Sequence, residues 1–176
     1  MKQRLRYLKG TKGFSLKFTP QQPNLVGYTD ADWSGGTTTR RSTTGYVFTL
    51  GSTPISWSSR QQPTVALSSR EAEYMALTQA TKEMLFLQTI CKTFGMTQES
   101  TNTIFTDNLE AIALTKGLPH SHQRNKHIDI HYHVVGEQPS IVFQHISGVE
   151  NPADAMTKSL PRASYQTALL VIESHA

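Results

Sequence analysis

The sequence feature that most constrains the fold of this chain is a short apolar segment that ends in two aspartates. Residues 25–32 read LVGYTDAD, which has the composition of a β-strand, and two glycines follow at 35 and 36. In a strand Asp30 and Asp32 share one face, because side chains alternate between the two faces. A carboxylate that faces the middle of a sheet needs a cation or several hydrogen-bond donors to offset its lost hydration. The pattern therefore indicates either a cation site or a plain strand end that leads into a turn.

The remaining sequence alternates between strand and helix patterns. Further segments with strand composition are 14–18, 44–50, 54–59, 103–107 and 140–146. Helical spacing runs from Ser68 or Ser69, either of which can cap a helix, to Gly95. Shorter helical patterns cover 3–9, 108–116 and 152–158. Gly51 and its neighbours predict a hairpin between the strands at 44–50 and 54–59, and the later strand–helix alternation requires parallel crossovers.

Length and composition fit one globular domain with tails. The chain has 176 residues, of which 37% are hydrophobic and 17% are charged. The single cysteine, Cys91, excludes a disulfide framework and a zinc site built on cysteines, and it fits a reducing compartment. No apolar run approaches the roughly 20 residues of a membrane span. We therefore expect a cytoplasmic protein without a membrane partner.

Positive charge is concentrated before the first acid. The net charge is +4, and six of the 17 basic residues precede Asp30: Lys2, Arg4, Arg6, Lys9, Lys12 and Lys17. The rest of the chain has 11 basic and 13 acidic residues, a formal charge of −2. This asymmetry predicts either a basic arm for phosphate backbones or, with equal weight, a solvated helix face.

Four acids occupy comparable places in the predicted elements. Asp30 lies in the strand at 25–32, and Asp107 ends the strand at 103–107. Glu73 lies one turn inside the long helix, and Asp154 lies in the first turn of the last helix. Strand ends and helix starts meet at one edge of an open α/β sheet, so the four acids can converge there. Such a cluster suits Mg²⁺ or Mn²⁺, and two ions about 4 Å apart would activate a water and stabilise the leaving oxygen of a phosphoryl displacement.

Five histidines gather in the segment 120–133. His127 and His131 are four residues apart, as zinc ligands on a helix would be, but the segment has no His-Glu-x-x-His motif and no third ligand. A surface or hydrogen-bonding cluster beside nucleic acid is the favoured interpretation over a zinc site.

Several local strings, in order, are similar to one known domain family. They are YTDADW at 28–33, RSTTGY at 41–46, QPTVALSS at 62–69, EAEY at 71–74, TDN at 106–108, KHIDI at 126–130 and AD at 153–154. Over 25–162 the sequence resembles the ribonuclease H domain of copia-type LTR-retrotransposon Pol polyproteins. Its start, LRYLKGT at 5–11, resembles the end of the reverse transcriptase that precedes that domain. The expected organisation is thus an arm at 1–24, the domain at 25–162 and a tail with helical spacing at 163–176.

The resemblance implies an α/β, ribonuclease H-like fold, with helices flanking a mixed five-stranded sheet of three antiparallel strands followed by parallel strands. It implies a two-metal-ion endoribonuclease that hydrolyses the RNA strand of RNA–DNA hybrids in reverse transcription, inside retrotransposon virus-like particles and beside the reverse transcriptase domain. The cofactor would be Mg²⁺, for which Mn²⁺ can substitute. The implied catalytic metal ligands are Asp30, Glu73, Asp107 and Asp154. Asp32 and Glu71 are then neighbours with lesser roles.

Polar residues beside the acids are candidates for substrate contacts. Short polar groups can exchange hydrogen bonds with a 2′-hydroxyl, and arginines can hold DNA phosphates. The candidates are Arg40, Arg41, Ser42, Thr43, Ser68, Ser69 and Asn108. A helix-cap role is equally compatible with the pattern at Ser68 and Ser69.

Two other functions are compatible with this fold. An inactive module would hold nucleic acid for the polymerase and would use the basic arm rather than the acids. An integrase-type transferase would need a late helical glutamate, whereas Glu73 precedes Asp107 here. The segment 134–140 looks shorter than in the family, and Gly136 with Pro139 would end a helix early. A shift of the strand at 140–146 would displace Asp154.

Overall fold

The computed structural model describes residues 2–10, 12, 13, 15, 24–33, 40–96, 100–115, 134–136 and 138–160. Its elements are α1 (Lys2–Gly10), β1 (Leu25–Asp32), β2 (Thr43–Leu50), β3 (Thr53–Gln61), α2 (Ser69–Thr93), β4 (Asn102–Thr106), α3 (Leu109–Thr115), β5 (Ile141–His145), the 3-10 turn η1 (Gly148–Glu150) and α5 (Asp154–Thr157). These bounds match the predicted segments closely. Of the predicted strand at 14–18 the structure describes residue 15 alone, and the histidine cluster at 120–133 and the tail at 163–176 lie outside the described residues.

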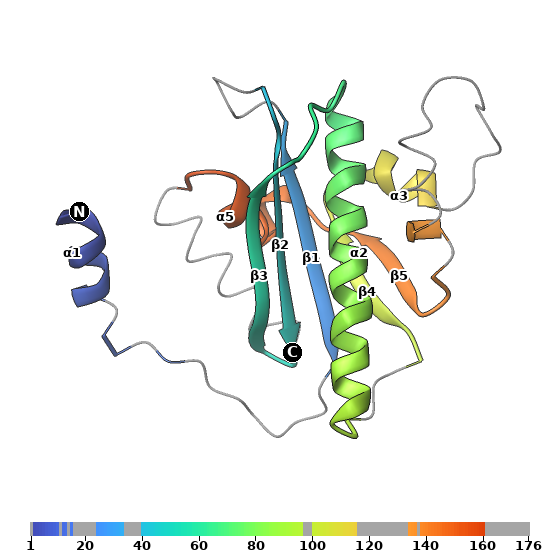
Figure 1. Ribbon diagram of the computed structural model, residues 1–176, viewed down its shortest axis with the longest axis horizontal. Coiled ribbons are helices and arrows are strands. Elements are labelled where there is room, and N and C mark those ends of the chain that lie inside the picture. Colours follow the sequence, from blue (N-terminus) through green and yellow to red (C-terminus); the bar gives the residue numbers. More distant parts are fainter. Residues whose placement is uncertain are drawn as a thin grey trace.

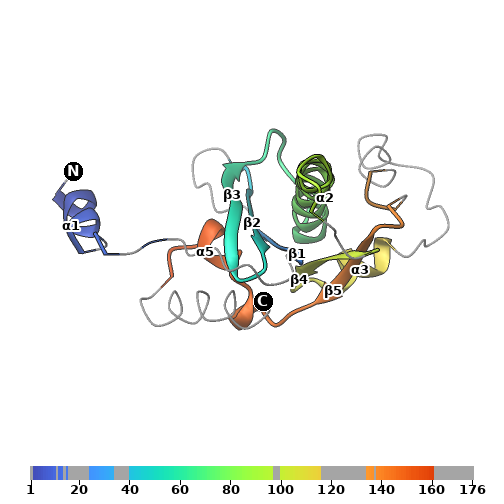
Figure 2. The same cartoon turned by 90° about the horizontal axis from the view of Figure 1, so that it is seen from below.

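The sheet is mixed and has five strands in the order β3-β2-β1-β4-β5. β1 pairs antiparallel with β2, and β2 pairs antiparallel with β3. β4 lies parallel to β1 and to β5. This arrangement confirms the predicted fold class. Helix α2 runs along one face of the sheet and α5 lies on the opposite face, whereas α1 stands apart (Figures 1 and 2).

Helix α2 forms one side of the main core. Its buried residues Leu77, Met84 and Leu87 pack with Phe48 of β2 and Ile104 of β4. Burial of large apolar side chains stabilises this layer by roughly 1.5–3 kcal/mol each. Among the described residues, no helix has the length and apolar composition to cross a membrane.

Local signals fix where α2 begins and ends. The Ser68 hydroxyl accepts a hydrogen bond from the Glu71 backbone N–H at 3.2 Å, and the Glu71 carboxylate accepts from the Leu67 N–H at 2.7 Å. These reciprocal bonds satisfy one N–H of the first turn and one N–H just before the cap. At the other end Gly95 has a φ of +70°, a conformation that glycine adopts without strain. The capping therefore places Glu73 just inside the first turns of the helix.

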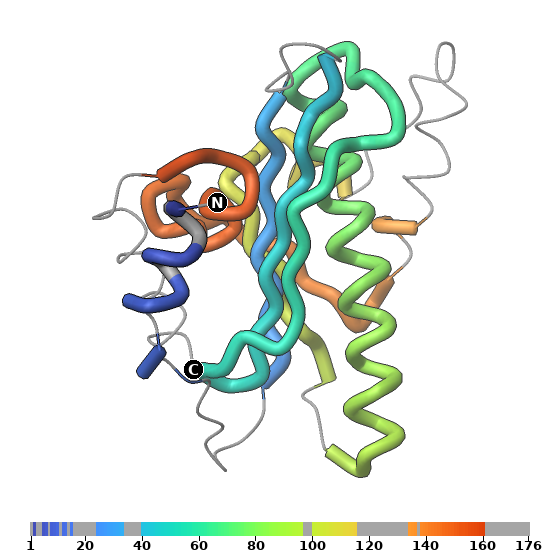
Figure 3. The backbone as a smooth tube through the Cα atoms, turned by 60° about the vertical axis from the view of Figure 1, so that its left-hand side comes forward, coloured from blue at the N-terminus to red at the C-terminus, as the bar shows by residue number. Residues whose placement is uncertain are grey.

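Helix α5 docks against the sheet through a glycine and an asparagine. A side chain at Gly45 would place its Cβ 2.7 Å from Met156 Cβ, so only glycine permits this approach of α5 to β2. The buried Asn151 amide donates to the Thr29 carbonyl at 3.0 Å, and its oxygen accepts from the Ala153 N–H at 3.1 Å. Figure 3 shows the segment that carries α5 against one side of the first strands, with α2 on the other side. These contacts fix Asp154 relative to β1.

The short segment 134–140 does not displace the strand after it. Residues 134–136 are helical, and Val135 is 1% exposed within the main core. β5 pairs with β4 without a register shift, from Asn102 opposite Ile141 to Thr106 opposite His145. The strand pairing therefore sets the position of the chain that leads to Asp154, and the shift considered from the sequence is absent.

We predict that Gly45→Ala lowers the free energy of unfolding by about 1–3 kcal/mol, because the added methyl overpacks the contact with α5. Urea denaturation followed by circular dichroism would measure the loss. Gly136→Ala is the control, since a Cβ there meets nothing within 4 Å. Equal stability of Gly45→Ala and the parent chain would contradict this account of α5 docking.

Candidate metal centre

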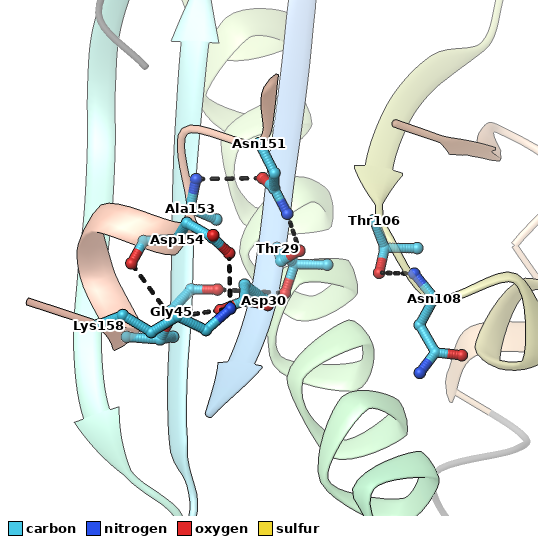
Figure 4. A network of polar contacts seen from close by, with 10 residues as sticks. Thr29, Asp30, Gly45, Thr106, Asn108, Asn151, Ala153, Asp154 and Lys158 are labelled. Atoms are coloured by element: carbon cyan, nitrogen blue, oxygen red, sulfur yellow. Dashed lines mark hydrogen bonds and ion pairs between the residues drawn. The ribbon is translucent and has the colours of Figure 1, made fainter. Parts of the chain in front are cut away.

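Three aspartates converge at one end of the central strands. Asp30 lies near the end of β1, Asp107 follows β4 directly, and Asp154 begins α5. Each offers one carboxylate oxygen, and these oxygens all lie within 4.8 Å of one another. β1 and β4 are parallel neighbours, so both strands end at the same edge of the sheet. Figure 4 shows Asp30 and Asp154 facing each other across this edge.

The fourth predicted acid, Glu73, lies beside this group. Its carboxylate accepts a hydrogen bond from the Ala31 backbone, while its Oε2 atom is buried and has no hydrogen-bond partner in the part of the chain that the structure describes. Burial, followed by the charges of Asp30 and Asp107, raises the pKa of Glu73 to about 9. The three aspartates are thus close enough to share one cation. The fourth acid, Glu73, has a buried oxygen that accepts no hydrogen bond from the described residues.

The acids of the cluster disfavour one another's charge. Burial raises the pKa of Asp107, and the nearby charge of Asp30 raises it further. Burial also raises the pKa of Asp154, and Asp30 and Asp107 add to that shift. Like charges in a poorly hydrated site are unfavourable until a cation offsets them. The cluster is therefore an electrostatically costly arrangement that additional positive charge would stabilise.

Two side chains that sequence reasoning missed offset part of this charge. The Lys158 ammonium lies 2.9 Å from Asp154 Oδ1 and 3.4 Å from Asp30 Oδ2, and the Thr157 hydroxyl donates to Asp30 Oδ2. Burial lowers the pKa of Lys158, but the hydrogen bond to Asp154 and the charge of Asp30 outweigh burial and raise the pKa overall. The i,i+4 spacing of Asp154 and Lys158 is the sequence signal that would have indicated this pair.

The donor set fits a hard divalent cation. Its ligand atoms are all carboxylate oxygens, which Mg²⁺ and Mn²⁺ prefer. The buried Oε2 of Glu73, which has no hydrogen-bond partner among the described residues, would gain a counter-charge from such an ion. Asp32 is half-buried and lies outside the group of three, and Glu71 caps α2.

The predicted substrate residues differ in accessibility. Exposed residues are Arg40, Arg41, Ser68 and Ser69, and half-buried residues are Thr43 and Asn108. Ser42 is 0% exposed, so its side chain does not face solvent, and its carbonyl accepts from the Gln62 N–H at 2.8 Å. Asn108 Oδ1 accepts from the Ala111 N–H at 2.8 Å and caps α3.

Solved structures identify the class of this architecture. The crystal structure of LC11-RNase H1 in complex with RNA/DNA hybrid superposes with a TM-score of 0.55 and 20% identity, over 76% of this chain and 93% of that chain. At this identity the likeness shows the fold, which is the ribonuclease H fold.

Three sequence relatives that align with nearly the whole chain are Pol polyproteins of retrotransposons. The chain is 42% identical over 175 residues to the retrovirus-related Pol polyprotein from transposon TNT 1-94 of Nicotiana tabacum, and it covers 13% of that protein. It is 37% identical over 171 residues to the corresponding polyprotein from transposon RE2 of Arabidopsis thaliana and covers 12% of it. No family model matches the chain. The chain is therefore a homologue of one segment of retrotransposon Pol polyproteins, which confirms the resemblance drawn from the motifs at that level.

We predict that, without divalent metal, the free energy of unfolding falls as the pH rises from about 4.5 to about 9. Glu73 has an ordinary pKa of 4.5 and a folded-state pKa of about 9, so in this window the folded chain binds more protons than the unfolded chain. Linkage then makes stability decrease with pH. The raised pKa values of Asp107 and Asp154 act in the same direction.

Urea denaturation in EDTA at several pH values in this range would measure the slope of the free energy of unfolding against pH. Glu73→Gln should flatten it, because the amide does not titrate. Glu110→Gln, at an exposed position in α3, is the matched control and should keep the parent slope. A slope that is the same in the parent and in Glu73→Gln would contradict the assignment.

Proposed function

We propose that the chain is a divalent-cation-dependent ribonuclease H that hydrolyses the RNA strand of RNA–DNA hybrids. The observation that carries this proposal is the convergence of Asp30, Asp107 and Asp154, with oxygens within 4.8 Å, at one edge of a ribonuclease H-fold sheet. Crowded carboxylates of this kind lower the stability of the fold and are explained by the binding of a cation. An inactive module would have no comparable need for them.

The side chains of the cluster would hold Mg²⁺, or Mn²⁺ in its place. Asp30, Asp107 and Asp154 would supply oxygens, with Glu73 completing the set. When bound, such an ion supplies Lewis-acid stabilisation of phosphate oxygens and makes water a better nucleophile. The protein fixes the ligand geometry, because Asp30 is 1% exposed within β1 and Asp154 is tied to the sheet through the Asn151 contacts.

Discrimination of hybrid from other duplexes would come from the residues around the cluster. An RNA–DNA hybrid presents 2′-hydroxyls on one strand only, so a protein that touches both strands can distinguish it. The exposed hydroxyls of Ser68 and Ser69 can meet ribose hydroxyls, and Arg40 and Arg41 can meet phosphates. LC11-RNase H1 was crystallised with an RNA/DNA hybrid, which supports the choice of substrate.

The proposed setting is reverse transcription within a retrotransposon particle. The homologous polyproteins are far longer than this chain, which supports a neighbouring reverse transcriptase domain as partner. Helix α1 carries exposed Lys2, Arg6 and Lys9 and would add phosphate contacts near that domain.

Asp30→Asn and Asp107→Asn should each abolish hybrid cleavage while leaving the fold intact. The amide keeps the shape of the side chain and loses the charge that holds the cation. A gel assay on an end-labelled hybrid in Mg²⁺ would measure the loss, and circular dichroism would check folding. Asp32→Asn is the matched control from the same strand and should keep most activity. Cleavage at the parent rate by either variant would remove that residue from the site.

Substrate choice gives an independent prediction. With three end-labelled duplexes of one sequence, cleavage should be strongest for the hybrid, weaker for double-stranded RNA and absent for double-stranded DNA. The product should end in a 3′-hydroxyl, because water attacks phosphorus and the ribose oxygen leaves. Mass spectrometry would identify the ends. Equal cutting of the DNA duplex, or a 2′,3′-cyclic phosphate, would contradict the proposed reaction.

A further inference from the structure

The acid cluster contains a cation that belongs to the protein itself. The Lys158 ammonium is 2.9 Å from Asp154 Oδ1 and 3.4 Å from Asp30 Oδ2, so it bridges two of the three converging aspartates (Figure 4). An ammonium has three donors and no acceptor, and it can serve both carboxylates at once. The lysine therefore occupies a position that positive charge is expected to take in this cluster.

The backbone holds this lysine at the cluster. Lys158 follows α5 directly and lies four residues after Asp154, the spacing at which two helical side chains meet. The close approach of α5 to Gly45 brings the end of the helix against β2, beside Asp30 on β1. The adjacent Thr157 hydroxyl also donates to Asp30. Two consecutive residues thus contact a carboxylate that is itself buried.

The lysine side chain is nevertheless able to leave. Its relative exposure is 41%, whereas that of Asp30 is 1%. A long lysine stem can turn its charged head into water, whereas a buried carboxylate on a strand has no such freedom. The contact can therefore open by rotation of one side chain, without movement of the sheet or of α5.

The same oxygens serve the lysine and the proposed cation site. Asp30 and Asp154 are two of the three aspartates with oxygens in mutual ligand range, and both are ion-paired to Lys158. Within the described part of the chain, Asp107 and Glu73 have no ion pair with a basic side chain. An ion held through Asp30 and Asp154 must compete with the ammonium, whereas Asp107 and Glu73 remain open to it.

We propose that Lys158 is a displaceable internal cation that competes with divalent metal for Asp30 and Asp154 and so sets the metal affinity of the cluster. This role rests on the proposed cation site and goes beyond it, since it assigns a positioning residue that tunes occupancy. When divalent metal is scarce the lysine holds the two carboxylates in place. As metal rises, the ammonium turns outward and gives up both oxygens.

Calorimetric titration of the folded chain with Mg²⁺, without nucleic acid, tests this role. Lys158→Met should bind Mg²⁺ about tenfold more tightly than the parent, the effect of removing one charge-assisted contact. Lys82→Met removes the same charge from an exposed position on α2 and is the matched control. It should bind as the parent does, which separates local competition from a change in net charge. Lys158→Arg keeps the charge and should restore the weaker binding.

Two further readouts detect displacement directly. In ¹⁵N-edited spectra of lysine side chains, one ammonium should be slow to exchange in EDTA, be absent from Lys158→Met, and be lost as Mg²⁺ is added. In EDTA, Lys158→Met should also melt below the parent and below Lys82→Met, because the carboxylates lose their counter-charge.

The outcomes separate this role from the proposed function. Equal Mg²⁺ affinity of Lys158→Met and the parent, with both binding metal, would overturn the competition and leave the cation site standing. An equal gain in Lys82→Met would show a net-charge effect and would also overturn it. Absence of Mg²⁺ binding in every variant would remove the cation site and this role together.

Discussion

Repulsion among four carboxylates at the ends of β1 and β4 is the constraint on which the rest of the structure depends. Burial and mutual charge raise the pKa of Glu73 to about 9, which shows how unfavourable full ionisation is in this cluster. The chain counters part of that repulsion with Lys158 and Thr157, both carried at the end of α5. The docking of α5 through Gly45 and Asn151 therefore both packs the helix on the sheet and holds Lys158 and Thr157 beside the acids.

Local sequence patterns predicted most of the fold. Strand-type composition marked β1, and the 3.6-residue period with a serine cap marked α2. Strand–helix alternation required parallel pairing among the later strands, as seen between β4 and its neighbours β1 and β5. These signals depend on neighbours in the chain. Placing Asp30 and Asp107 at strand ends therefore predicted that they meet at one edge, and the structure has them there.

Contacts between segments that are distant in the chain could not be predicted from these local patterns. A side chain at Gly45 would clash with residues more than 100 positions away in the chain. The sequence around Gly45 does not predict this contact. Ser42 is buried although it is polar, and its carbonyl is bonded to the Gln62 N–H, 20 positions further along the chain. The short length of segment 134–140 is visible in the sequence. That it leaves β5 in place is seen only in the regular β4–β5 register and in the burial of Val135.

The central claim is that the converging carboxylates bind a divalent metal ion, and anomalous diffraction from crystals soaked in millimolar Mn²⁺ tests it most directly. The account predicts an anomalous peak in contact with carboxylate oxygens of Asp30, Asp107 and Asp154, with the Lys158 side chain turned away from the two aspartates it bridges. Crystals with well-ordered carboxylates, Lys158 still in place and no anomalous peak at this edge of the sheet would contradict it.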